Sequence, residues 1–381
     1  MREVEHLTVN GAIRIGRRVY WCLGRGIEGS VDRWMGIADE SVSVGAREMA
    51  CRATLGGLGF EKAAEVLWRL GQIRIGKERL RELTEAEGRR MMEASRTGLL
   101  APQWSASDCR VTPEGITRQM LGCDGVMVPV VTAAEKQKRR ANRRHRRKGR
   151  GRRRGRHRGS DLGYKEFKIA TFYDAGKEHL HVVGTAGNHD ALGRLMRREA
   201  GRLAVNAADE RVAVTDGAEW IRRQFETRLP TVEVRILDYF HLMEHVGEAA
   251  AVCFGEGTEA ASAWRAALSA AVCEEGAAGL LVKIHETLRS VRSPARRKAL
   301  TNLQQYVAKR ADMLDYPTYR ARGFDIGSGM TEAACKTLTL RLKGSGMRWD
   351  RPNAEAIMAL AAVDQSRLWQ SYWNLQRQAA A

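Results

Sequence analysis

The 381-residue sequence has no long apolar run, no paired-cysteine motif and few aromatic residues. No apolar stretch approaches the ~18 residues of a membrane-spanning helix, and residues 1–16 lack the apolar core of a signal peptide. The seven cysteines stand singly and are odd in number. This argues against a disulfide framework and predicts a reducing compartment. With aromatic residues at only 6%, we expect few base-stacking platforms.

Acidic residues are absent from one segment, 136–158, which holds 15 Lys and Arg residues. The whole chain carries a formal net charge of +19, so without those 15 charges it would carry +4. Such a charge implies a polyanionic partner, either nucleic acid or an acidic membrane surface. We expect a disordered basic loop that binds nucleic acid, with a solvated linker as the alternative. Its expected DNA contacts are Arg139, Arg140, Arg143, Arg144, Arg146 and Arg147.

An apolar content of 44% predicts a globular protein, and the length suggests two or three domains. Residues 1–45 give no clear pattern. In 46–115 the apolar spacing predicts two short helices around a turn at Gly71. This region resembles a helix-turn-helix, although an ordinary helical hairpin has the same pattern. On the second helix, the residues expected to face the DNA major groove are Lys77, Arg79 and Arg81.

The middle of the chain alternates strands and helices. Strands are expected at 121–131, 165–174, 179–187, 211–217 and 232–238, with helices at 190–204 and 218–229. Mixed strands followed by alternating helices suit an α/β sheet of the ribonuclease-H type. After residue 239 the composition favours helix almost throughout.

Three acids occupy informative positions in this pattern. Asp124 lies on the first strand, Asp216 ends another, and Glu332 falls in the first turn of a helix that begins at Ser328. Chain ends beside a sheet are where α/β proteins place their chemistry. Carboxylates gathered there would repel one another, and Mg²⁺ or Mn²⁺ would relieve the repulsion. Each acid alone also has a simpler explanation, an Asp-Gly turn or a favourable helix dipole.

Several motifs occur in a fixed order: CDGVMV around Asp124, VTDGAEWI around Asp216, ILDYFHLMEH, IGSGMTEAACKTL around Glu332, and RLKGSGMRW. A helical tail ending near WQSYW follows them. With this ordered set, residues 121–373 resemble bacterial insertion-sequence transposases with a DDE active site. They are most similar to the ISKra-type family, and more distantly to Mutator-like enzymes.

The resemblance implies a fold and a site. The fold is an RNase H-like catalytic core (116–241) with a large all-helical insertion (242–325), plus the helical N-terminal DNA-binding region. Residues 326–381 would supply a core helix and a helical tail. Asp124, Asp216 and Glu332 would be catalytic and would hold two Mg²⁺ or Mn²⁺ ions. The family's C/D-x-x-H motif would read Asp238-Tyr-Phe-His241, and these two residues would support the site.

The expected function is therefore a DNA transposase, acting on the terminal inverted repeats of its element and on target DNA. We expect a homo-oligomer on DNA in a bacterial cytoplasm, associated with the nucleoid. The alternatives are an RNase H-like nuclease that does not join strands, and a non-catalytic nucleic-acid-binding protein. His241 and His245 have the spacing of a zinc pair but lack a third ligand. The expected phosphate contacts near Glu332 are Arg341, Lys343 and Arg348, with a solvated surface as the alternative.

Overall fold

The computed structural model describes residues 2–17, 20–22, 26–28, 41–111, 115–138, 141, 163–344 and 347–380. Its centre is a five-stranded mixed sheet in the order β7-β6-β5-β8-β9. The strands are β5 (Arg118–Pro129), β6 (Tyr164–Asp174), β7 (Leu180–Thr185), β8 (Glu210–Thr215) and β9 (Val234–Leu237). β5, β6 and β7 pair antiparallel, whereas β8 runs parallel to both β5 and β9.

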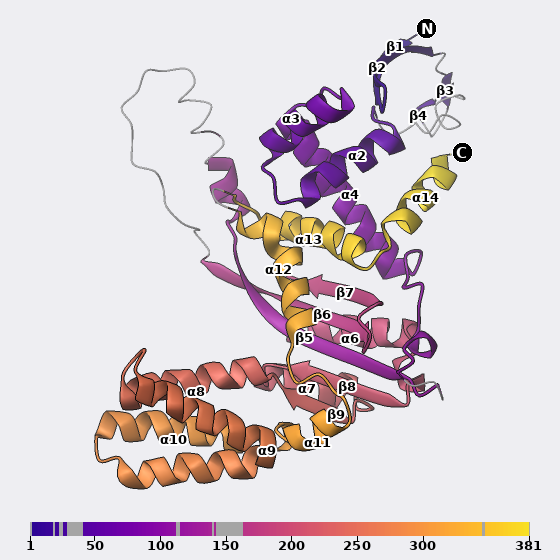
Figure 1. Ribbon diagram of the computed structural model, residues 1–381. Helices are drawn as coiled ribbons and strands as arrows, with labels where there is room; N and C mark the ends of the chain where they lie inside the picture. The colour runs from indigo at the N-terminus through magenta and orange to yellow at the C-terminus, as the bar shows by residue number, and fades with distance from the viewer. Residues whose placement is uncertain are drawn as a thin grey trace, which may run out of the picture.

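Helices cover both faces of this sheet (Figure 1). On one face, α6 (His189–Arg202) and α7 (Glu219–Arg228) bury a core against β5, β6 and β8. On the other face, α12 (Gly329–Lys343) and α13 (Arg351–Gln365) pack over β5, β6 and β7. The mixed α/β class expected from the sequence is confirmed, and the sheet is compatible with an RNase H-like core.

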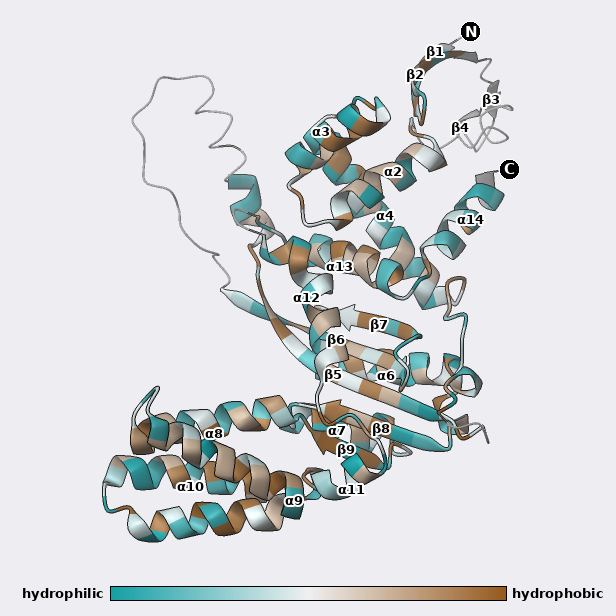
Figure 2. Ribbon diagram, in the orientation of Figure 1, coloured by the Kyte–Doolittle hydropathy of each residue, from teal (hydrophilic) through white to brown (hydrophobic). Residues whose placement is uncertain are grey.

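The helices that follow β9 form a separate bundle beside the β8–β9 half of the sheet (Figure 1). They are α8 (Tyr239–Phe254), α9 (Glu259–Ser290), α10 (Pro294–Ala308) and α11 (Tyr316–Ala321). Their apolar residues share one core with the hydrophobic stretches of β8 and β9, which are brown in Figure 2. The long helical segment expected after residue 239 is therefore observed, and its core is continuous with the sheet.

The N-terminal helices pack on α13, at the top of the molecule in Figure 1. They are α2 (Val44–Leu55), α3 (Phe60–Gly71) and α4 (Lys77–Thr97). The helical hairpin expected around Gly71 is thus confirmed. A bulkier residue than Gly88 would not fit on α4, because an added Cβ would lie 2.2 Å from the carbonyl oxygen of Ala356 on α13.

Both ends of the chain contain features that the sequence pattern missed. Residues 1–45 include two hairpins, β1 (Arg2–Thr8) with β2 (Gly11–Arg17), and β3 (Tyr20–Cys22) with β4 (Gly26–Glu28). The Asn10-Gly11 pair was the missed signal, since it is typical of a hairpin turn. The tail breaks at Arg367, which has a left-handed φ of 56°, and continues as α14 (Trp369–Ala380).

No helix among the described residues is long and apolar enough to cross a membrane. The structure also contains 3₁₀ turns at η1 (Ala106–Asp108), η2 (Val205–Ala207) and η3 (Ala311–Met313).

Candidate active site

Asp124 and Asp216 lie side by side on neighbouring parallel strands. In the β5–β8 register, Cys123 pairs with Thr215, so each Asp follows the same rung of the sheet. The Asp124 Oδ1 atom accepts the Gly125 N–H at 2.6 Å, and the Asp216 Oδ1 atom accepts the Ala218 N–H at 2.8 Å. Both carboxylates are therefore oriented by the backbone that follows them, at the end of β8 and within β5.

Glu332 reaches this place because α12 lies directly on β5. Thr331 shares a 2.8 Å hydrogen bond with Thr171 of β6. A Cβ added at Gly122 would lie 1.8 Å from the Thr331 Oγ1 atom. Glycine at this point of β5 is what allows the helix to approach. One turn later on the same helix face, Cys335 lines the same pocket as Asp124.

Asp124 and Glu332 line one pocket of about 630 Å³. Two lysines of α12, Lys336 and Lys343, line the same pocket, and both are exposed. The pocket thus combines carboxylates at one end of the helix with cations along it. Both lysines follow Glu332 along α12, so a polyanion lying in the pocket would meet favourable charges on that side of the acids.

The three acids also interact electrostatically. Burial is the main cause that raises the pKa of Asp124, and the negative charges of Asp216 and Glu332 raise it further. The Gly125 N–H opposes this by stabilising the carboxylate. Mutual repulsion of this kind favours a proton or a cation between the groups.

Ser328 connects Glu332 to a fourth acid, Asp238. The Ser328 hydroxyl contacts the Asp238 carboxylate and lies 2.9 Å from the Glu332 Oε1 atom. Asp238 is buried, caps α8 through the Phe240 N–H at 2.8 Å, and donates its own N–H to the Thr215 carbonyl at 2.7 Å. Ser328 was expected only as the start of the helix that carries Glu332, so its bridging contact was missed.

His241 lies in the first turn of α8, where its Nδ1 atom is 3.4 Å from Glu244. Its ring meets that of His245 at a centroid distance of 5.0 Å. Within the described residues, no three His, Cys, Asp or Glu side chains are grouped so that they could hold one metal ion. This applies to the histidine pair, so the structure gives no support to zinc there.

The same finding applies to the three acids as they lie here. Asp124, Asp216 and Glu332 each have one carboxylate oxygen engaged by a local donor on the chain. Their chemistry nevertheless fits a hard divalent cation, because all three offer oxygen and Asp124 is destabilised as an anion. Binding by all three would require the carboxylates to draw closer together.

The cations expected on the second helix of the hairpin have different surroundings. Lys77 is 3.0 Å from Glu61, and the Arg79 guanidinium donates to the Ser41 hydroxyl at 3.1 Å. Both are exposed. The Arg81 side chain is only 17% exposed and is bound by three glutamates of its own helix. The expectation that Arg81 faces the solvent is therefore wrong. Ion pairs with glutamates of the same helix keep its side chain against the helix surface.

Arg341 is a second correction, because it is buried rather than exposed on a DNA-facing surface. It is 4% exposed, and its guanidinium stacks on Phe60 of α3 at 4.3 Å. Burial lowers its pKa to about 10. Of its two expected companions, Lys343 is exposed at the pocket and Arg348 is half-buried, donating to the Met347 carbonyl at 2.6 Å.

The six arginines expected as loop contacts, Arg139, Arg140, Arg143, Arg144, Arg146 and Arg147, lie outside the described residues. The segment's first residue, Lys136, is described and forms an ion pair with Asp350.

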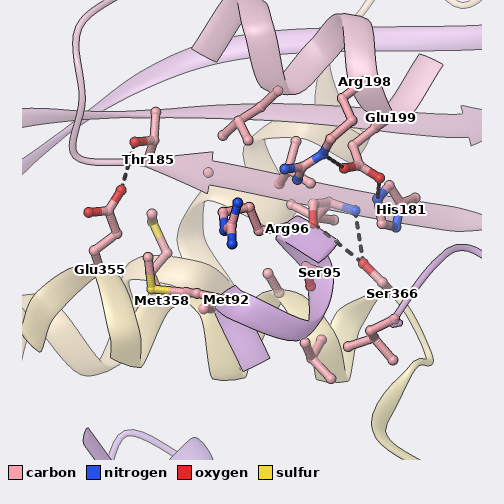
Figure 3. Close-up of a pocket in the computed structure, with 18 of the residues that line it drawn as sticks. Met92, Ser95, Arg96, His181, Thr185, Arg198, Glu199, Glu355, Met358 and Ser366 are labelled. Atoms are coloured by element: carbon pink, nitrogen blue, oxygen red, sulfur yellow. Dashed lines mark hydrogen bonds and ion pairs between the residues drawn. The ribbon is translucent and has the colours of Figure 1, made fainter. Parts of the chain in front are cut away.

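A second pocket of about 600 Å³ lies where α4, α6, β7 and α13 meet (Figure 3). Most of its charges are compensated nearby: Arg96 pairs with Glu93, and Arg198 pairs with Glu199, which also binds His181 at 3.2 Å. None of the three acids lines it. We therefore regard it as a cavity between the N-terminal helices and the sheet.

Comparisons with known proteins do not assign this chain to a family. No protein-family model and no curated protein matches the sequence. Among solved structures, a Drosophila P element transposase strand transfer complex matches 85% of this chain and 80% of that chain, with 12% sequence identity and a TM-score of 0.28. At this TM-score the likeness supports no conclusion about the function of this chain.

Proposed function

We propose that this protein is a DNA transposase of the DDE type, with an RNase H-like catalytic core and a helical insertion. Asp124, Asp216 and Glu332 would be its catalytic acids, and Asp238 and His241 would support them. The substrate would be the terminal inverted repeats of an insertion sequence of the ISKra type, followed by target DNA. Hydrolysis would free a 3′-hydroxyl at the element end, and that hydroxyl would then attack a target phosphodiester.

The approach of the three acids is the observation that supports this proposal. They come from β5, from the end of β8 and from α12, 208 positions apart in sequence between Asp124 and Glu332. Their charges act together on the pKa of Asp124. A turn Asp or a helix-dipole Glu has no reason to lie where its charge acts on another carboxylate in a protein as basic as this one. Shared chemistry on a phosphodiester supplies that reason.

Mg²⁺ or Mn²⁺, bound as two ions, would activate the attacking oxygen and stabilise the leaving one. The chain's own contribution is to hold the DNA and orient the acids. Lys336 and Lys343 would bind phosphates beside the pocket. Ser328 would orient Glu332 relative to Asp238 through its hydroxyl. Oligomer formation on DNA and location at the bacterial nucleoid are part of the same proposal.

Replacing Glu332 with Gln tests the proposal. The change keeps the size of the side chain and removes one negative charge, so the protein should fold and still bind element-end DNA. Cleavage and strand joining should both fall by about 10³-fold or more, because the acids act as a unit. The measurement is a Mn²⁺-dependent assay with labelled end DNA, scoring nicked and joined products separately.

Glu219→Gln is the matched control, since Glu219 is an exposed first-turn acid three residues after Asp216. It should cleave and join like the wild type. A wild-type protein that cuts but never joins would indicate the nuclease alternative, and one that only binds would indicate a non-catalytic protein. A Glu332→Gln protein with wild-type rates in Mg²⁺ would remove Glu332 from the site.

A further inference from the structure

The helical insertion contacts the backbone that carries Asp216. Gly217, the next residue, has a left-handed φ of 70°, a conformation that residues with a side chain rarely adopt. A Cβ at Gly217 would lie 2.7 Å from the Arg310 Nε atom and 2.7 Å from Leu237. The turn after Asp216 is therefore tightly enclosed, with Arg310 on one side and the end of β9 on the other.

Two side chains, one in the last turn of α10 and one just after it, hold the carbonyl groups of this turn. The Arg310 Nε–H donates to the Gly217 carbonyl at 2.9 Å. The Tyr306 hydroxyl lies 3.5 Å from the Asp216 carbonyl, a longer contact. The Arg310 guanidinium also stacks on the Tyr306 ring at 3.9 Å. Because this stacking fixes both side chains, the carbonyl of Gly217 has a preorganised donor.

A third contact repeats this arrangement at the neighbouring strand end. Tyr316 of α11 is fully buried, and its hydroxyl donates to the Leu237 carbonyl at 2.8 Å. Leu237 immediately precedes Asp238, the acid that Ser328 links to Glu332. The insertion thus binds the main chain next to Asp216 and next to Asp238, and it does so with side chains that lie far from both carboxylates in sequence.

We propose that Arg310 is a positioning residue for Asp216, so that the insertion sets the geometry of the site in addition to any role in DNA binding. This inference rests on the proposed function. Arg310 touches no reacting atom in this account. It fixes the Gly217 carbonyl, and thereby the turn in which the Ala218 N–H orients the Asp216 carboxylate. Small displacements of a catalytic group are costly, on the order of 10²-fold in rate for about 1 Å.

The experiment compares Arg310→Met, Arg310→Lys and wild type in the full-length protein. Arg310→Met should slow single-turnover cleavage of element-end DNA about 10- to 100-fold at saturating DNA. Its Kd for the same DNA, measured without divalent cation, should stay within about 2-fold of wild type, since the carboxylates and the DNA-facing lysines are unchanged. Arg310→Lys should recover part of the rate, because an ammonium group can still donate to the Gly217 carbonyl.

Arg222→Met is the matched control. The Arg222 guanidinium, on α7, contacts the Lys309 carbonyl at 3.3 Å and Asp312 at 3.1 Å. It therefore joins the core to the same segment as Arg310 without touching the Asp216–Gly217 turn. Arg222→Met should cleave within about 2-fold of wild type, because a partly exposed ion pair contributes little. Gly217→Ala combined with Arg310→Met should cost little more than either change alone, since both act on one turn.

The outcomes separate this inference from the proposed function. A wild-type protein that does not cleave end DNA overturns both. An active wild type with an equally active Arg310→Met overturns only the positioning role. The same holds if Arg222→Met is impaired as strongly as Arg310→Met, or if weaker DNA binding accounts for the whole loss of rate.

Discussion

Asp124 is the residue at which burial and charge act in the same direction. Its pKa is raised in the folded protein, mainly by burial and then by Asp216 and Glu332, whereas an unfolded Asp titrates near 3.9. The folded state therefore binds more protons than the unfolded state between the two pKa values. Under that condition the free energy of unfolding decreases as pH rises through this window. The ionised Asp124 thus costs stability at neutral pH when no cation is bound.

Asp124→Asn should raise the Tm at pH 7 in the absence of divalent cations. The gain should disappear as the pH falls below the unfolded pKa, because Asp124 is then neutral in both states. Asp209→Asn is the control of opposite sign: two hydrogen bonds from Thr117 lower the pKa of Asp209. Its Tm should not rise at pH 7. Scanning calorimetry of wild type and both variants from acid to neutral pH checks this, and a Tm gain of Asp124→Asn over wild type that is no larger at pH 7 than at acid pH contradicts it.

The residue scale also shows where sequence reasoning succeeded and failed. Asp124 lies within β5 beside the end of β8, which Asp216 follows, and Glu332 shares a pocket with Asp124. Their joint catalytic role stays a prediction. Arg341 was misplaced because its charge was taken as a sign of exposure. Its spacing indicated otherwise, since Ala334, Leu338, Arg341 and Leu342 form one buried stripe of α12. Periodicity is the better guide when a long side chain can bury its stem and stack on an aromatic ring.

At the scale of elements, α12 connects the central sheet to the N-terminal helices. Its first turn carries Glu332 to the sheet, and its last turns pack Arg341 on α3. Most helices and strands could be predicted because alternation and helical spacing are local properties of a sequence. The contact of Gly122 with Thr331 could not, since it depends on two residues that are distant in sequence. The hydrogen bond between Arg310 and Gly217 could not be predicted for the same reason.

The hairpin of α3 and α4 presents Lys77 and Arg79 to solvent at the start of α4, and we propose that they read element ends. Changing both to Ala should reduce the preference for end DNA over random DNA by about 10-fold or more, because a good base contact contributes about 1–3 kcal/mol. Competition binding at fixed salt measures this ratio.

Arg81→Ala is the control for that change, since Arg81 forms ion pairs with three glutamates of α4 and is not free to contact DNA. It should lower the Tm while leaving the DNA preference unchanged. Equal losses of affinity for end and random DNA in the Lys77→Ala/Arg79→Ala protein would mean that the two residues contact only phosphates.

At the scale of the whole molecule, most of the net charge of +19 comes from one segment. Fifteen cations of 136–158 precede β6, whose first residue, Tyr164, pairs with Pro129 at the end of β5. The two strands that flank the segment, β5 and β6, are thus already paired where the segment begins and ends. A much shorter connection would be enough to join them. A segment that the fold does not require, and that is this basic, is best explained by a polyanion that the protein binds.

Deleting 139–158 tests that explanation and keeps Lys136, whose ion pair with Asp350 belongs to the fold. The deletion removes 13 of the 15 cations, all but Lys136 and Lys138. The Tm should change little, because a short linker can join antiparallel neighbours. Affinity for random DNA should drop, and the slope of log K against log salt should flatten by about 0.9 for each phosphate that the protein no longer neutralises. The matched control is a protein of equal length, in which Gly and Ser replace residues 139–158. It separates the effect of charge from the effect of length, and it should behave like the deletion. An unchanged salt slope in both proteins would show that the segment does not bind DNA. The cations of α4 and α12 would then have to account for DNA binding.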